Sequence, residues 1–406
     1  MLSIYLQAEV KGNQLNFVTF KNLHNSYSFK RVLFNYRSSC RKILSNIDDT
    51  KEYFSHSYFQ SLAEQYSNNI NQVESSLLID EADELLTKPY LNITKKHLDT
   101  LCINPQNYIS FAPYYWQINN EHPMKKSTVK AEYRDSRSNP FLAERSDKPK
   151  LAQLCARIHL LVLASIKNND KKYIEYIHMQ LNIWFVDQNT RMNPHMIYAQ
   201  IRPWSGANKG HGIIDSRWLI LLFDAIALLK HKMGYVIEKE VVSWLVQFAK
   251  WILSSLSGFN EILRENNRGS WVDVLLCYIG LAVNKSQVAS CILEQSYSER
   301  LKKQIDNNGF QPLELKRYNP VSYSLYNMYP LYYLNNLNIH FNNKNKGSSH
   351  TNLLQNAEVE LYHLIKDHEE GEIEHINFCS SNALNLYYPY SYYQLSNFPC
   401  VMPFTL

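Results

Sequence analysis

Apolar side chains recur at helical spacing through most of the middle of the chain, and this pattern limits the possible folds more than any other feature. Ile174, Ile177 and Leu181 are three and four residues apart, which places them on one face of a helix. The stretch 241–256 repeats the pattern, and Gly258 is expected to end that helix. Further helices are predicted at 151–166, 216–231, 271–283, 288–305, 321–337 and 352–367.

Helix after helix with short polar connections predicts an all-α fold of stacked antiparallel hairpins. The periodicity leaves open whether these hairpins form a bundle, a solenoid or a closed ring. Strand-like alternation is confined to short patches near the start and in the last thirty residues. Three segments interrupt the helices, and of these 104–141 and 187–215 are expected to be functional loops, while 340–351 is expected to be a mobile connection.

The composition is that of a folded protein with no strong charge bias. The 406 residues are 45% hydrophobic, which excludes a wholly disordered chain. Net charge is 42 − 37 = +5, which permits an acidic partner without requiring one. Basic residues are scattered, so no nucleic acid partner is expected. No apolar run is expected to span a membrane, and Met1–Gly12 lacks the pattern of a signal peptide.

The seven cysteines form no CxxC pair and are odd in number. This pattern favours reduced thiols over a disulfide framework or a zinc site. The chain also lacks the glycine-rich phosphate loops, the HExxH zinc motif and the GxSxG nucleophile motif. No paired carboxylates stand out for glycoside hydrolysis.

The segment 266–273 (NNRGSWVD) is the first candidate site. Ser270 and Asp273 resemble a capping box, which predicts a helix that begins at Trp271. Asn267 and Arg268 would then precede a helix N-terminus, where donors and the helix dipole favour a carboxylate. From this segment alone, a simple turn with a solvated arginine is the favoured interpretation.

The segment 311–323 is the second candidate site. Asn319 followed by Pro320 is a strong helix start, with Tyr323 in the first turn and Arg317 in the preceding loop. A neighbouring guanidinium lowers the pKa of a phenol, which is one way to obtain a tyrosine base. The alternative, favoured without further information, is that Tyr323 packs as an ordinary helix residue.

Two aromatic-rich segments complete the candidates. Tyr114, Tyr115 and Trp116 follow a proline and suit either a stacking platform for a sugar or an apolar plug under a loop. Asn193 and the proline after it predict another helix start, with Gln200 farther along that helix or at its exit.

In this order, the four segments resemble the alginate lyase family of polysaccharide lyases. The family patterns DYxSxAPYWWP, WFxxxxTxMNPxxxYAQ…GxGIID, NNHGxWxD and QPxELxRxxxxxY correspond here to residues 107–116, 184–215, 266–273 and 311–323. The resemblance covers about residues 75–340. It leaves 1–74 as an N-terminal helical extension and 341–406 as a divergent C-terminal segment that completes or flanks the core.

The resemblance implies an incomplete (α/α) toroid of antiparallel helical hairpins with a central cleft. It implies β-elimination on a uronic-acid polymer such as alginate, with an acidic polysaccharide or oligosaccharide as partner and no cofactor or metal. The C5 proton of such a sugar becomes acidic only when cations and hydrogen-bond donors meet the developing charge. The implied catalytic residues are Asn267, Arg268, Arg317 and Tyr323, and the implied substrate-binding residues are Tyr114, Tyr115, Trp116, Tyr198, Gln200, Asn266, Trp271 and Gln311.

Position 268 departs from the family pattern, because Arg268 stands where the family has histidine. An arginine neutralises a carboxylate but cannot act as a base at neutral pH. One hypothesis keeps the enzyme active, with Tyr323 as base and then acid on one sugar face. The other is a catalytically impaired protein that binds acidic glycans.

The family resemblance implies a periplasmic or secreted protein. Because Met1–Gly12 lacks the pattern of a signal peptide, a cytoplasmic protein is the alternative. The polymer, endo or exo action and the oligomeric state are left open by the sequence.

Overall fold

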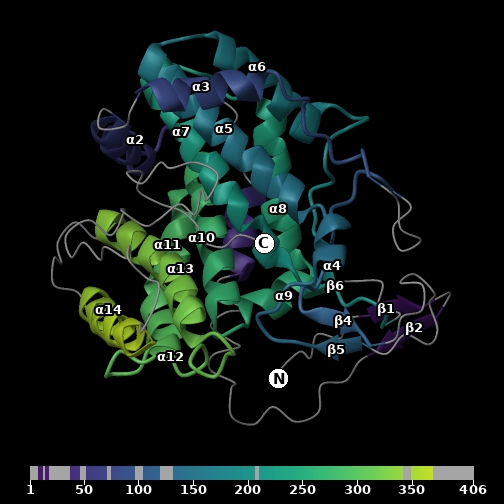
Figure 1. The fold of residues 1–406 in the computed structure, drawn as a ribbon, viewed down its shortest axis with the longest axis vertical. Helices are drawn as coiled ribbons and strands as arrows, with labels where there is room; N and C mark the ends of the chain where they lie inside the picture. Colours follow the sequence, from purple (N-terminus) through teal and green to yellow (C-terminus); the bar gives the residue numbers. More distant parts are fainter. Residues whose placement is uncertain are drawn as a thin grey trace.

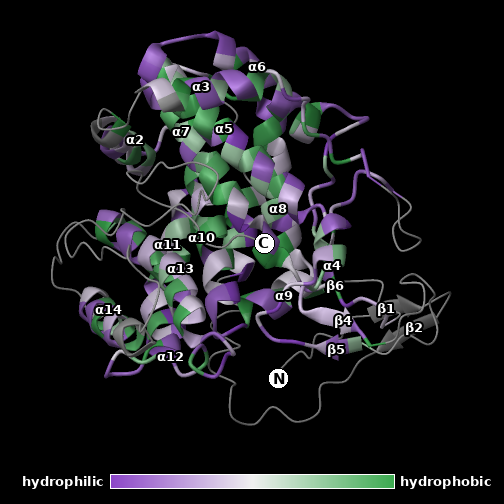
Figure 2. Ribbon diagram, in the orientation of Figure 1, coloured by the Kyte–Doolittle hydropathy of each residue, from purple (hydrophilic) through white to green (hydrophobic). Residues whose placement is uncertain are grey.

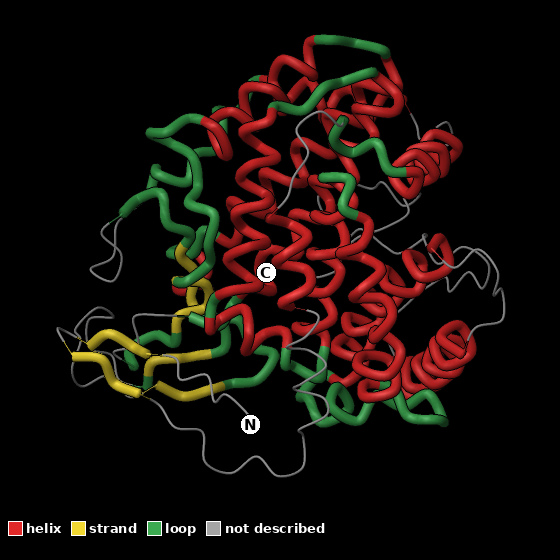
Figure 3. Tube along the Cα trace, turned by 180° about the vertical axis from the view of Figure 1, so that it is seen from behind, coloured by secondary structure: helices red, strands yellow, loops and turns green. Residues whose placement is uncertain are grey.

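The computed structural model describes residues 8–11, 14–17, 37–45, 52–70, 75–96, 104–118, 131–205, 210–341 and 349–368. Helices dominate these residues, and the short strands gather at one end of the helical body (Figures 1 and 3). The longer helices are α2 (Ser57–Ile70), α3 (Ser75–Leu86), α5 (Lys148–Asn168), α6 (Lys172–Leu181), α7 (Leu219–Met233), α8 (Lys239–Ser254), α10 (Asn267–Ala282), α11 (Ser286–Ser296), α13 (Pro320–Phe341) and α14 (Ser349–His368).

Shorter pieces connect these helices. They are α4 (Pro140–Glu144), α9 (Leu256–Ile262), α12 (Lys302–Gln304), the 3₁₀ turn η2 (Ile213–Trp218) and the π-helical turns η1 (Asn182–Val186) and η3 (Tyr297–Leu301). The strands are β1 (Ala8–Lys11), β2 (Gln14–Phe17), β3 (Ile109–Phe111), β4 (Tyr115–Gln117), β5 (Ala131–Tyr133) and β6 (Tyr198–Ile201).

Consecutive helices pack against each other, as α5 does with α6 and α10 with α11. A large apolar core of described residues runs through the body, and two smaller apolar clusters lie beside it. Every residue of α7 from Leu219 to Leu229 is buried, which explains why this segment is apolar on all sides (Figure 2). The prediction of an all-α fold of helical hairpins is confirmed, and an incomplete toroid is consistent with it. Residues of the predicted N-terminal extension, such as Phe59, lie in the same core.

Within the described ranges, the strands form three two-stranded sheets. β3 pairs in parallel with β6, β4 pairs antiparallel with β5, and β1 pairs antiparallel with β2. The predicted functional loops 104–141 and 187–215 therefore contain strands. The helix predicted after Asn193 is wrong, because the chain there leads into β6, with Gln200 in that strand.

Two predicted helix ends are also wrong. The side chain of Asn266 accepts a hydrogen bond from the Arg268 amide at 3.2 Å, so α10 begins four residues before Trp271 and Ser270 lies inside it. Ser255 caps α9 in the same way, with its Oγ 3.0 Å from the Gly258 amide. Gly258 thus lies within α9, where an added Cβ would come 1.8 Å from the Ile252 carbonyl oxygen.

The start of α13 is as predicted. Asn319 Oδ1 accepts a hydrogen bond from the Ser322 amide at 3.1 Å, and Pro320 is the first helical residue. Tyr323 therefore projects from the first turn of α13, directly after the loop that carries Arg317.

Among the described residues, α5 is long and apolar enough to cross a membrane by length and composition, contrary to the sequence expectation. Most of it is buried in the core, where it packs against α6 and α7. The four described cysteines, Cys40, Cys155, Cys277 and Cys291, are free thiols. Cys102, Cys379 and Cys400, the centre of the 340–351 connection and the last thirty residues lie outside the described ranges.

Candidate functional site

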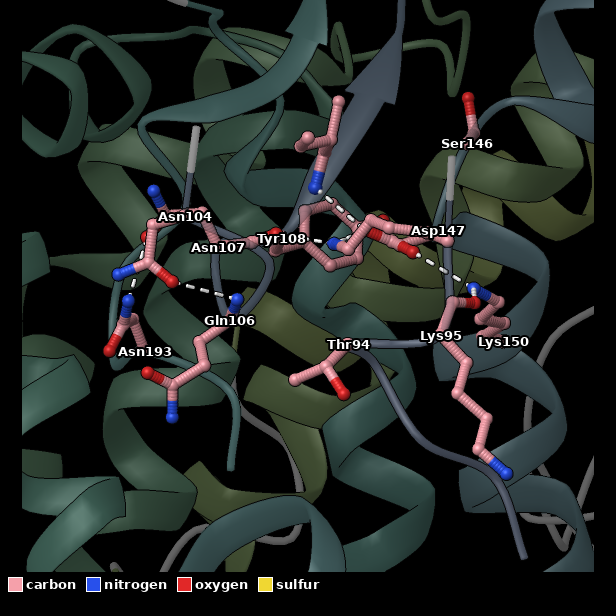
Figure 4. A network of polar contacts seen from close by, with 12 residues as sticks. Thr94, Lys95, Asn104, Gln106, Asn107, Tyr108, Ser146, Asp147, Lys150 and Asn193 are labelled. Atoms are coloured by element: carbon pink, nitrogen blue, oxygen red, sulfur yellow. Dashed lines mark hydrogen bonds and ion pairs between the residues drawn. The ribbon is translucent and has the colours of Figure 1, made fainter. Parts of the chain in front are cut away.

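The buried carboxylate of Asp147 fixes the segment that leads into β3. Its Oδ2 accepts a hydrogen bond from the Ile109 amide at 3.0 Å and pairs with Lys96, and Lys150 lies 3.4 Å from Oδ1. On the other side of the segment, Asn193 donates to Asn107 Oδ1 at 2.8 Å, and Figure 4 shows both ends of this network. These polar contacts tie the start of β3 and the residues before it to the helical body.

A second buried carboxylate, Asp215, joins β3 to β6. It accepts hydrogen bonds from the hydroxyls of Tyr108 at 3.1 Å and Ser110 at 2.6 Å, and from Gln200 Nε2 at 2.8 Å. Ser110 Oγ also accepts the Gln200 amide at 2.7 Å. The side chain of Gln200 is therefore held by Asp215, and its φ of 50° is stabilised by these bonds.

Glycines allow this close approach. A Cβ on Gly210 would lie 1.7 Å from the Ala199 carbonyl oxygen, and one on Gly212 would lie 2.5 Å from the Gln200 side chain. In the motif YAQ…GxGIID, the two glycines therefore allow their backbone to approach β6 closely, and Asp215 binds Gln200 of β6 and Ser110 of β3.

Tyr323 is the centre of the candidate active site. Its hydroxyl lies 2.5 Å from the hydroxyl of Tyr114, which follows β3. The Arg317 guanidinium carbon lies 3.6 Å from the centroid of the Tyr323 ring. Three residues from two distant parts of the sequence therefore meet at the start of α13.

Arg317 is already paired with a carboxylate. Its Nε lies 3.0 Å from Asp135 Oδ2 and its Nη2 lies 2.5 Å from Oδ1. The Tyr318 amide also donates to Asp135 at 3.0 Å. The hydrogen bonds from Arg317 lower the pKa of Asp135 to about 2. Asp135, in the turn after β5, was not identified from the sequence.

The expected lowering of the Tyr323 pKa is not found. Burial raises the pKa of Tyr323 well above 10, the nearby Tyr114 adds to this effect, and Arg317 opposes it without reversing it. The sequence argument considered only the cation, whereas the buried position has the larger effect. Tyr323 is thus a neutral phenol at pH 7 in the absence of substrate.

Asn267 and Gln311 lie beside this cluster but are largely buried. Asn267 Nδ2 donates to Glu314 Oε1 at 3.3 Å, and Asn327 donates to Gln311 Oε1 at 2.9 Å. Burial raises the pKa of Glu314, while Arg317 and the bond from Asn267 lower it. Glu314 stands within the quoted motif and could have been found there as a buried acid next to Arg317.

Arg268 points toward α9. Its Nε and Nη2 donate to Glu261 Oε2 and Oε1 at 2.9 and 2.6 Å, which is the two-pronged geometry typical of arginine–carboxylate pairs. Glu261 is fully buried, whereas the Arg268 side chain is 24% exposed. The charged residue acting on the Tyr323 phenol is Arg317, and Arg268 is not placed beside it by these contacts.

The other residues of 266–273 that match the family pattern have partners within the protein. Asp273 pairs with the fully buried Arg300 at 2.6 Å, and Arg300 also donates to the carbonyl oxygens of Ile262 and Arg264. A Cβ on Gly269 would lie 2.7 Å from Arg300 Nη1 and 2.2 Å from the Arg264 oxygen. Gly269 and Asp273 therefore serve the packing of Arg300 under the helix start.

The predicted substrate-binding aromatics divide into two groups. Trp271 is buried in the core, 6.2 Å from the ring of Tyr326 and 5.8 Å from that of Tyr333. Tyr115 and Trp116 are half-buried on β4, and Tyr198 is half-buried on β6. Of the predicted aromatic residues, Tyr114 contacts Tyr323 directly, hydroxyl to hydroxyl.

The remaining predicted residues surround this group at different depths. Asn266 serves as the N-cap of α10, and the Gln200 side chain donates a hydrogen bond to Asp215. No group of three described His, Cys, Asp or Glu residues is arranged to hold a metal ion.

Comparisons with known proteins bear on the family and on the fold. Residues 95–362 match the sequence profile of the alginate lyase family. Among solved structures, the fold is similar to that of an alginate lyase from Bacteroides ovatus, with a TM-score of 0.67 and 24% identity over 79% of this chain and 84% of that chain. No curated protein matches.

Proposed function

The chain belongs to the alginate lyase family of polysaccharide lyases, and we propose that it cleaves a uronic-acid polymer by β-elimination with Tyr323 as base and acid. The observation that carries the proposal is the contact of Tyr323 with both Tyr114 and Arg317. A phenolic oxygen, a second hydroxyl and a guanidinium are the groups that proton abstraction next to a carboxylate needs.

In the proposed reaction, the Tyr323 oxygen, as phenolate, takes the C5 proton of the uronate. The electron pair of that C–H bond forms the C4=C5 double bond as the C4–O4 bond breaks. Tyr323, now protonated, returns the proton to O4 of the leaving chain, so that no proton is gained or lost overall. Both transfers on one sugar face fit a single tyrosine, and Tyr114 donates a hydrogen bond to the phenolate at the start.

Arg317 is the proposed cation for the uronate carboxylate. Its Nε and Nη2 bind Asp135, while its Nη1 has no hydrogen bond to a described residue and remains able to donate. Asn267 supports Arg317 indirectly, because it binds Glu314, the buried acid whose pKa Arg317 lowers. The neutral resting state of Tyr323 makes phenolate formation the costly step, so activity should increase at alkaline pH.

The second candidate is a binder of acidic glycans without turnover. The observation that favours it is the pairing of Arg268 with buried Glu261, because the residue in the place of the family histidine then has neither a free charge nor a basic nitrogen. In this alternative, oligosaccharide binds without a new ultraviolet absorbance.

The test is a panel of polymannuronate, polyguluronate and glucuronan, monitored for the ultraviolet absorbance of the unsaturated product. The proposal expects product with wild type on at least one polymer, and none with Tyr323→Phe. Tyr90→Phe is the matched control, since Tyr90 is an exposed tyrosine outside the site. Product from Arg268→His alone, with none from wild type, would establish the binder instead.

A further inference from the structure

The turn that follows β5 lies against the candidate active site and has a strained backbone. The Arg137 amide donates to the Arg134 carbonyl oxygen at 3.2 Å, which closes a four-residue turn with Ser136 in its third position. Ser136 has a φ of 62°. Glycine is typical of such a position, because a side chain on left-handed backbone is unfavourable. A serine that persists there indicates that the surrounding contacts fix the turn.

These contacts attach the turn to both residues that touch Tyr323. The Arg134 amide donates to the Tyr114 carbonyl oxygen at 2.8 Å, and the Asp135 carboxylate accepts two hydrogen bonds from Arg317. Tyr114 contacts the Tyr323 hydroxyl, and the Arg317 guanidinium lies over the Tyr323 ring. The residue directly after Asp135 is therefore held beside the phenol.

The hydroxyl of Ser136 is buried and lacks a good partner. Its Oγ makes no hydrogen bond of good geometry within the part of the chain that the structure describes. Such a group is unfavourable and uncommon in a folded protein. Burial and the neighbouring Tyr114 raise the pKa of Tyr323, whereas Arg317 and the Ser136 hydroxyl lower it. Ser136 thus lies close enough to the Tyr323 oxygen to respond to its charge.

Ionisation of Tyr323 would give this hydroxyl its partner. The neutral phenol already shares a hydrogen bond with Tyr114 at 2.5 Å and is a weak acceptor. A phenolate is a strong acceptor, because hydrogen bonds to a charged oxygen are about twice as strong as those between neutral groups. A serine hydroxyl rotates about its Cβ–Oγ bond, so it can turn toward the phenolate while the strained backbone stays in place. Donors from Tyr114 and Ser136 still leave the phenolate a lone pair for the C5 proton.

The charged groups around Tyr323 keep their charge at neutral and moderately alkaline pH. Arg317 is a permanent cation. Its hydrogen bonds lower the pKa of Asp135 to about 2. Tyr133, whose ring centroid lies 6.0 Å from that of Tyr114, has its pKa raised to about 12 by burial and by Asp135. A change of ionisation between about pH 7 and 9 therefore reports on the hydroxyl pair of Tyr323 and Tyr114.

We propose that Ser136 is a positioning residue of the elimination, whose hydroxyl donates a hydrogen bond to the Tyr323 oxygen while that oxygen is a phenolate. This proposal rests on the proposed function of Tyr323. It accounts for a serine at a backbone position that suits glycine. It also gives neighbouring residues of one turn separate roles, because Asp135 holds Arg317 and Ser136 stabilises the charge on Tyr323.

The first test measures the charge on residue 323 and needs no turnover. A polyfluorinated tyrosine replaces Tyr323, which lowers the pKa of the phenol into an accessible range, and fluorine NMR follows its titration. Ser136→Gly removes the hydroxyl and suits the left-handed backbone, whereas Ser136→Ala removes the hydroxyl and keeps the strain. Ser138→Ala is the matched control, because Ser138 is an exposed serine two residues farther along the same connection.

Loss of the hydroxyl is expected to raise the pKa of residue 323 by about one unit in both Ser136 variants, because a hydrogen bond to a charged oxygen is lost. With the natural tyrosine, kcat/KM should decrease about tenfold between about pH 7 and 9, with the slope of the profile unchanged and KM within about twofold of wild type. A merely structural serine predicts instead that Ser136→Gly behaves like wild type. Ser138→Ala should match wild type in both measurements, and melting curves verify the fold.

An unchanged pKa of residue 323 in Ser136→Gly would overturn the proposal, and so would an equal increase in Ser138→Ala. The outcomes separate from those of the proposed function, because the fluorine titration requires no polymer. An increase in both Ser136 variants, with no product from wild type on any polymer, would support the hydrogen bond and remove the lyase proposal. Product from wild type, with the same pKa in all variants, would keep the lyase and remove the role of Ser136.

Discussion

Two arginine–carboxylate pairs in this molecule have similar geometry and different surroundings. Arg268 and Glu261 are seven residues apart and meet at the corner of α9 and α10, where the glutamate is fully buried. Arg317 and Asp135 are 182 residues apart, and both side chains are about one quarter exposed. The first pair lies within one helical corner, and the second joins the strands to the start of α13.

The difference teaches that an arginine in a family motif need not act on substrate. A buried acid left without its partner has a large desolvation cost, so the first pair is expected to matter for folding. A partly exposed acid can be solvated, and Arg317 also contacts the Tyr323 ring, so the second pair is expected to matter for chemistry.

The largest effect should separate the two regions by activity. Arg317→Ala removes the cation over Tyr323 and is expected to lower kcat/KM by about 10²–10³, the usual loss for one group that stabilises developing charge. Initial rates of unsaturated product at saturating and limiting polymer measure it. A loss below about threefold, with the fold intact, would end the assignment of Arg317 to the chemistry.

Stability should separate the regions in the opposite direction. Arg268→Ala leaves Glu261 buried and unpaired and is expected to cost about 3 kcal/mol in the free energy of unfolding. Arg317→Ala should cost about 1 kcal/mol or less. Urea unfolding compares the two, and Arg268→Ala/Glu261→Gln should restore most of the loss. Equal costs for the two alanine variants would contradict the comparison.

The pH profile sharpens the role of Tyr323. Because its pKa is raised above 10, the phenolate is scarce at neutral pH and its fraction grows about tenfold with each pH unit as the pH increases toward that pKa. We expect log kcat/KM to increase with a slope near +1 from about pH 7 to 9. A plateau across neutral pH would instead place the catalytic proton on another group.

The smallest expected effect concerns Asp135. Asp135→Asn keeps a hydrogen-bond acceptor for Arg317 but removes the negative charge that pairs with it. The guanidinium is therefore freer to bind a uronate carboxylate. KM for polymannuronate is expected to decrease about threefold, with a change in stability below about 1 kcal/mol. The matched variant Glu261→Gln should leave KM unchanged, and a decrease of KM in both variants would show that net charge alone is responsible.

Sequence reasoning located the helices and the motif segments because both depend on residues close together in the chain. The apolar rhythm of 241–256 and the Asn319–Pro320 start of α13 are local signals, and the structure has both. The pairing of β3 with β6 joins residues about ninety apart, so no local pattern predicted it.

The partners of the two arginines were missed for different reasons. Asp135 lies in a segment interpreted only as a loop, and its contact with Arg317 joins residues 182 apart in the sequence. Glu261 is close in sequence, but it lies on α9, a helix that was not predicted because Gly258 was interpreted as the end of the helix 241–256. The raised pKa of Tyr323 depends on burial, which a motif does not contain.

Gly269 has a further consequence for experiments that score many variants at once. Its missing side chain makes room for Arg300, so even a methyl group there would require the buried Arg300 side chain and the Arg264 carbonyl to shift. In a deep mutational scan read out by activity alone, Gly269 would rank with Tyr323, although it has no place in the elimination. Cellular abundance scored in parallel would tell them apart, because the tyrosine variants would accumulate normally and the glycine variants would be degraded.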